Sequence, residues 1–104
     1  GWLRASHRAI DPALSTDMVP YHNHADPQAL TPNEIYKFEI SLEPMAYLIK
    51  QGHRLRIEIV NGDSPATEIL WSHYYRPDKI GSDTIHHDAA HPSELILPVS
   101  PAPS

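Results

Sequence analysis

Residues 34–43, EIYKFEISLE, and residues 53–61, HRLRIEIVN, decide the fold class of this chain. In both segments apolar and polar side chains alternate, which is the pattern of a strand with one buried and one solvated face. The apolar positions are Tyr36, Phe38, Ile40 and Leu42 in the first segment and Leu55, Ile57 and Ile59 in the second. The two segments together predict an antiparallel pair of half-buried strands.

Weaker strand patterns flank this pair. Residues 1–9 and 93–99 are predicted to be extended, and residues 67–75 are a further candidate. The chain contains 11 prolines, and since an interior proline costs a helix about 3 kcal/mol, helix is predicted to be scarce. Between the two main segments we expect at most one helical turn, followed by Gly52, which can supply the positive φ of a turn.

Short strands, scarce helix and a long proline-containing loop over residues 10–33 predict an all-β fold, an antiparallel β-sandwich of Greek-key or jelly-roll type. Four or five strands are too few for a complete sandwich, because an open one exposes its apolar inner face and unpaired edges. We therefore expect a fragment of a longer protein, whose missing strands come from upstream sequence or from a second chain. Residues 1–100 are predicted to form this domain and residues 101–104 a frayed tail.

Composition excludes several classes of protein. The 104 residues carry a net charge of −5 and no basic stripe, so no nucleic-acid partner is expected. No apolar run approaches the roughly 20 residues that a membrane helix needs. The absence of cysteine excludes disulfides and thiolate metal sites. We expect a soluble protein and favour the cytoplasm, although cysteine content identifies no compartment.

A histidine cluster is the densest group of chemically active side chains. The stretch IHHDAAHPSELILPV, residues 85–99, contains His86, His87, Asp88 and His91. In an extended chain His86 and His87 point to opposite faces and cannot bind one ion together, whereas either could pair with His91 across a turn.

A second histidine pair lies in the long loop. His22 and His24 share a side if that stretch is extended, so a combined metal site of His22, His24, His86 and His91 is one alternative. The competing interpretation, which we adopt, is that these histidines hydrogen-bond to loop backbone. We therefore predict no metal and no other cofactor.

Catalytic residues are not predicted in this chain. None of its serines lies in a G-x-S-x-G elbow, and its carboxylates fall on solvated strand faces or in turns. The aromatic residues could instead stack on sugars, as in carbohydrate-binding sandwiches, or cover a domain interface. These residues are Trp2, Trp71, Tyr74 and Tyr75.

Four segments in this order resemble one known family. They are GWLRASHRA (1–9), LTPNEIYKFEI (30–40), GHRLRIEI (52–59) followed by DSP, and DTIHHDAAHPSELILPV (83–99). The chain, from Gly1 to about Pro101, resembles the C-terminal domain of the cocaine-esterase (CocE/NonD) and X-prolyl dipeptidyl-peptidase family of serine hydrolases. The resemblance implies a jelly-roll domain, similar to galactose-binding folds, that follows an α/β-hydrolase domain. That upstream domain would carry the serine, aspartate and histidine triad.

The resemblance also implies structural roles for polar residues. The run His91, Pro92 and Ser93 would turn the chain into its last strand. A polar network would anchor the long loop, with carboxylates or backbone carbonyls as partners of its arginines. Its expected members are Arg4, His7, Arg8, Asp63, Asp88 and His91, with Asp11 as a further partner. Residues 66–83 depart from the commoner family pattern, which leaves the subfamily open.

Residues and resemblance together predict the non-catalytic C-terminal β-domain of an ester- or amide-cleaving serine hydrolase, inactive by itself. Its expected partner is the upstream hydrolase domain, whose active site it would support by shaping the cleft, docking or building a homo-oligomer. Two alternatives remain open: a stand-alone carbohydrate-binding module and a small histidine-ligated metal-binding β-protein.

Overall fold

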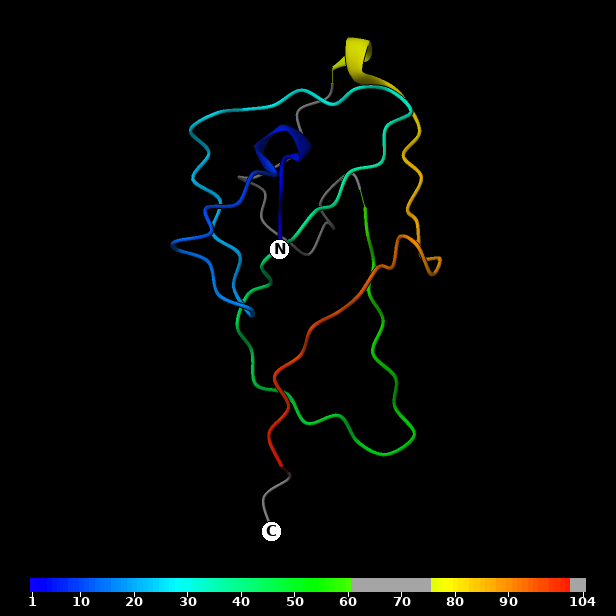
Figure 1. Ribbon diagram of the computed structural model, residues 1–104. Helices are drawn as coiled ribbons and strands as arrows, with labels where there is room; N and C mark the ends of the chain where they lie inside the picture. The colour runs from blue at the N-terminus through cyan, green and yellow to red at the C-terminus, as the bar shows by residue number, and fades with distance from the viewer. Residues whose placement is uncertain (61–75, 102–104) are drawn as a thin grey trace. The chain divides into compact units, whose positions relative to one another are not determined.

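The computed structural model describes residues 1–60 and 76–101. Two short 3-10 helices lie within these ranges, η1 (Ala5–His7) and η2 (Pro77–Lys79), and neither contains a buried residue. Pro77 occupies the start of η2, where the missing backbone N–H is no loss and the fixed φ suits the helix. Figure 1 draws the rest of the described chain as turns and irregular segments. Scarce helix agrees with the proline content.

A turn over residues 50–53 follows the expectation for Gly52. The backbone amide of His53 donates to the carbonyl of Lys50 at 3.1 Å. Gly52, at the third position, has a φ of 83°, as a type II turn requires. Because glycine has no Cβ, this conformation is unstrained there. The sequence prediction that Gly52 supplies a positive φ is confirmed.

Local hydrogen bonds organise the first half of the long loop. The amide of Asp11 donates to the carbonyl of Tyr21 at 2.8 Å, and the Asp11 carboxylate accepts from the amide of Ala13 at 2.9 Å. The Ser15 hydroxyl accepts the amide of Tyr21 at 2.8 Å. An aspartate and a serine thus satisfy backbone amides that have no ladder partner.

The segments predicted as strands are not paired in the described residues, which contain no assigned strand. Leu55, Ile57 and Ile59 are 54%, 57% and 64% exposed, and Phe38 and Ile40 are also exposed. This differs from the burial that a closed sandwich requires. A strand has no hydrogen-bond partner within itself, so an alternating sequence alone cannot bury its apolar face. The β-sandwich, in jelly-roll form, stays a prediction.

The chain divides into two compact units. Unit 1 comprises Gly1–Ala46 and Glu94–Ser104, and unit 2 comprises Tyr47–Ser93. Within unit 1, Gly1 lies against the backbone of Ser41, where a Cβ would meet the carbonyl oxygen. The predicted single domain over residues 1–100 stays a prediction, and residues 102–104 of the predicted tail lie outside the described residues.

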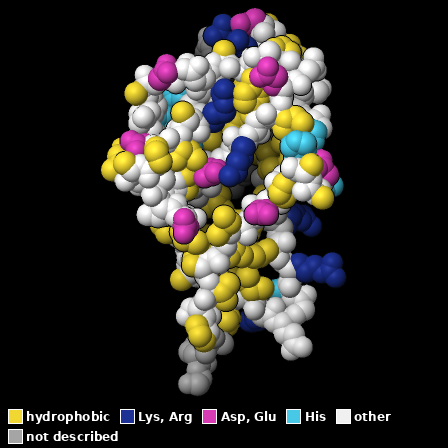
Figure 2. All heavy atoms as spheres, viewed as in Figure 1, with side chains coloured by type: hydrophobic (Ala, Val, Ile, Leu, Met, Phe, Trp, Pro, Cys, Tyr) yellow, Lys and Arg dark blue, Asp and Glu magenta, His cyan; other side chains and the backbone are white. Residues whose placement is uncertain are grey.

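Apolar side chains lie on the surface of both units. None of the described residues is buried, and large apolar groups such as Met45, Tyr47 and Val99 are 85%, 79% and 86% exposed. Figure 2 shows hydrophobic atoms spread over the visible face. Within residues 1–60 and 76–101, no helix has the length and apolar character needed to cross a membrane.

Candidate functional site

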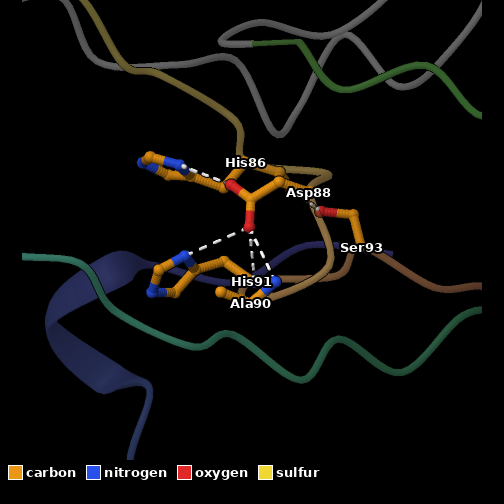
Figure 3. A network of polar contacts seen from close by, with 5 residues as sticks. All are labelled: His86, Asp88, Ala90, His91 and Ser93. Carbon is orange, nitrogen blue, oxygen red and sulfur yellow. Dashed lines mark hydrogen bonds and ion pairs between the residues drawn. The ribbon is translucent and has the colours of Figure 1, made fainter.

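The best-defined polar site is a loop in unit 2, residues 86–93, which we call the His–Asp–His loop. Asp88 Oδ1 accepts two backbone amides, from Ala90 and His91, each at 2.9 Å. The Ser93 hydroxyl donates to the backbone carbonyl of His86 and closes the loop (Figure 3). Aspartate commonly hydrogen-bonds to the amides two and three residues further on, so the sequence D-A-A-H itself favours this turn.

The Asp88 carboxylate lies between two imidazole rings (Figure 3). Nδ1 of His91 is 3.4 Å from Oδ1, and Nδ1 of His86 is 3.7 Å from Oδ2. The two ring centroids are 5.4 Å apart and tilted by 55°. The side chains of His86, Asp88 and His91 are 38%, 56% and 45% exposed, so solvent ions can reach all three.

The loop backbone also sets the charge of this site. The amide that His91 donates to Asp88 lowers the pKa of the carboxyl below its ordinary value. Desolvation opposes this effect in part, and the amide of Ala90 and the nearby His91 ring lower the pKa further. The carboxylate is therefore fully ionised at neutral pH.

The sequence left open whether His86 or His87 pairs with His91, and the structure selects His86. One ligand atom each from His86, Asp88 and His91 lies within 4.8 Å of the other two, whereas His87 is not in this group. His87, which the period-two pattern places on the opposite face, is exposed. Asp88 and His91, both predicted members of the polar network, contact each other here rather than an arginine.

A second histidine contact lies in unit 1. The Nδ1 atoms of His7 and His24 are 2.9 Å apart, so one must carry the proton and the other accept it. The rings of His22 and His24 have centroids 6.1 Å apart. The resemblance placed His7 in the network that anchors the long loop but did not name His24 as its partner, because a contact across 17 residues leaves no periodic signal.

The combined four-histidine metal site stays an alternative that the structure does not test. His22 and His24 belong to unit 1, whereas His86 and His91 belong to unit 2.

Arg8 makes the main contacts of the predicted polar network in unit 1. Its Nη1 donates to the carbonyls of Gln28 at 2.7 Å and Ala5 at 3.1 Å. Its guanidinium carbon lies 4.4 Å from the ring centroid of Tyr36, a cation–π distance. Among the described residues, the partners of Arg8 are thus two carbonyls and a ring.

The other predicted members lie elsewhere. Arg4 is exposed and contributes its backbone carbonyl, which accepts the amide of His7 at 2.8 Å. Asp63 lies outside the described residues, as do Trp71, Tyr74 and Tyr75 of the predicted aromatic group. Trp2 is 66% exposed. The anchoring role of the network stays a prediction.

Comparison with known proteins identifies the family. Residues 1–96 match the family described as the X-Pro dipeptidyl-peptidase C-terminal non-catalytic domain. The chain belongs to this family. The resemblance predicted from the sequence is thereby confirmed.

Two relatives of this family member are known from mycobacteria. Proteins named "putative serine esterase" in Mycobacterium bovis and Mycobacterium tuberculosis are each 34% identical over 103 residues. The match covers 95% of this chain but 15% of each relative, so the chain spans a small part of their length. No solved structure matches the chain significantly.

Two serines of the described chain contact backbone groups. The hydroxyls of Ser15 and Ser93 are engaged with backbone groups. Within residues 1–60 and 76–101, no serine hydroxyl hydrogen-bonds to an imidazole, which is the contact that activates a serine nucleophile.

Proposed function

We propose that this chain is the C-terminal β-domain of a serine hydrolase that cleaves ester or amide bonds. The catalytic triad would lie in an α/β-hydrolase domain elsewhere in the same protein. The observation that carries the proposal is the family match over residues 1–96. It is supported by esterase-named relatives whose length lies mostly outside the matched part.

The surface of the chain supports a docking role. Consecutive apolar residues Tyr47, Leu48 and Ile49 are 79%, 67% and 45% exposed, and the alternating segment with Leu55 and Ile57 follows them. Covering apolar surface contributes roughly 25 cal/mol per Å², so these groups favour a partner surface over water. The partner that we propose is the hydrolase domain of the same protein.

Domain docking gives this chain a defined part in catalysis without a reacting group. A domain fixed against the hydrolase domain can form a wall of the substrate cleft and hold neighbouring loops in place. A homo-oligomer would cover the same apolar groups. Size-exclusion chromatography of the intact protein separates the two arrangements, because docking within one protein leaves it monomeric.

Esterase activity tests the proposal that catalysis resides in the hydrolase domain and not in this chain. The intact protein and the separate 104-residue chain are assayed on p-nitrophenyl acetate. We expect turnover by the intact protein, and for the chain alone a rate no higher than that of an equal concentration of histidine in solution.

The matched control is Ser93→Ala in the intact protein. The Ser93 hydroxyl is engaged with the carbonyl of His86, so kcat should stay within about twofold of the unsubstituted protein. Turnover by the chain alone, abolished by replacing one of its serines, would show instead that the chain is itself an esterase.

A further inference from the structure

In place of the metal-free chain predicted from the sequence, we propose that the His–Asp–His loop binds a divalent first-row transition ion, such as Zn²⁺, through His86, Asp88 and His91. The proposal goes beyond the docking function and is independent of it. It rests on three ligand-bearing side chains that lie within one eight-residue loop and face one another (Figure 3).

The distances within the loop suit one small ion. With bonds of about 2.0–2.2 Å to nitrogen and oxygen, two ligands of a tetrahedral zinc ion lie about 3.4 Å apart. Nδ1 of His91 lies 3.4 Å from Oδ1 of Asp88, and Nδ1 of His86 lies 3.7 Å from Oδ2, so each ring approaches a different oxygen of the carboxylate. One ligand atom from each of the three residues lies within 4.8 Å of the other two, so these side chains must draw closer together to hold one ion.

The turn holds the carboxylate in position for this role. Oδ1 of Asp88 accepts the amides of Ala90 and His91, which fixes the carboxylate plane. Oδ2, which takes no part in these two bonds, lies toward His86. Hydrogen bonds of this kind orient metal ligands and contribute to affinity.

The ligand set selects the class of ion. Two imidazole nitrogens and one carboxylate oxygen suit Zn²⁺, Ni²⁺ or Cu²⁺, whereas Ca²⁺ and Mg²⁺ prefer oxygen ligands. The three side chains are between 38% and 56% exposed, so water can complete the coordination. A bound ion would join His86 to His91 and stiffen the loop between them.

Zinc titration of the intact protein tests the site. The protein is treated with EDTA, desalted and titrated with Zn²⁺ in a calorimeter at neutral pH. Replacing a ligand, His86→Ala or His91→Ala, should weaken the binding of one equivalent of zinc by at least about tenfold. The control is His87→Ala, which removes the neighbouring histidine outside the group and should leave the titration unchanged.

A conservative variant covers the case in which an alanine variant fails to fold. Asp88→Asn keeps an oxygen that can accept the two turn amides but removes the charge. It should retain the metal-free melting temperature while weakening zinc binding at least about tenfold. Three outcomes would overturn the proposal: no effect of the three ligand substitutions, an equal effect of His87→Ala, or binding of Ca²⁺ as tight as that of Zn²⁺.

Discussion

The His–Asp–His loop and the two alternating segments, residues 34–43 and 53–60, differ in where their partners lie. The loop satisfies its own polar groups: Asp88 bonds the amides of Ala90 and His91, and Ser93 bonds the carbonyl of His86. All of these contacts span seven residues or fewer. The alternating segments instead present apolar side chains to solvent and form no strand in the described chain.

The difference shows which features of the sequence act locally. A turn aspartate needs only the amides that follow it, so its structure forms wherever the segment is placed. A half-buried strand needs a neighbouring strand and an opposing apolar layer, and the segment cannot supply either by itself. We therefore expect the alternating segments, unlike the loop, to depend on the rest of the protein.

The largest expected effect comes from deleting apolar volume in an alternating segment. In the intact protein, where we propose that the apolar face is covered, Ile57→Ala should lower the free energy of unfolding by about 2–5 kcal/mol. Glu58→Ala is the matched control, because the predicted register places Glu58 on the opposite face. Its ion pair with Arg56 spans 3.6 Å between side chains that are 69% and 83% exposed, so its loss should cost within about 0.5 kcal/mol.

Urea unfolding of the two variants measures this contrast. Equal losses, or a larger loss for Glu58→Ala, would mean that the predicted strand register is wrong. A small loss for both would mean that Ile57 stays as exposed in the intact protein as its 57% in this chain.

The sequence predicted those features whose causes are local. Gly52 was placed in its turn because few other residues tolerate a positive φ. His86 and His87 were separated because adjacent residues diverge. The four family segments predicted membership of the family that residues 1–96 match.

Other contacts could not be predicted from the sequence. The contact of His7 with His24 and the two carbonyls that accept from Arg8 follow from the path of a long loop. No periodic pattern records such a path. The sandwich itself depends on strand partners that alternation does not specify, so it stays a prediction.

A smaller effect on stability is expected from a substitution in the turn over residues 50–53. This turn depends on its own residues, in contrast to the alternating segments. Gly52→Ala should destabilise the protein by about 1 kcal/mol, because alanine is strained at a φ of 83°. A Cβ at Gly52 would contact nothing within 4 Å, and the same is true at Gly81, whose φ lies outside the left-handed range. Gly81→Ala is therefore the control and should be neutral or slightly stabilising. Equal melting temperatures for the two variants would show that the turn conformation does not limit stability.

Hydrogen exchange tests most directly whether the alternating segments depend on the rest of the protein. It is measured on the intact protein and on the separate chain under the same conditions. Amide exchange reports the free energy of local opening, so a covered strand exchanges far more slowly than an exposed one. We expect residues 34–43 and 53–60 to exchange slowly in the intact protein and rapidly in the separate chain, with residues 86–93 alike in both. Equal exchange of the alternating segments in the two samples would contradict the account.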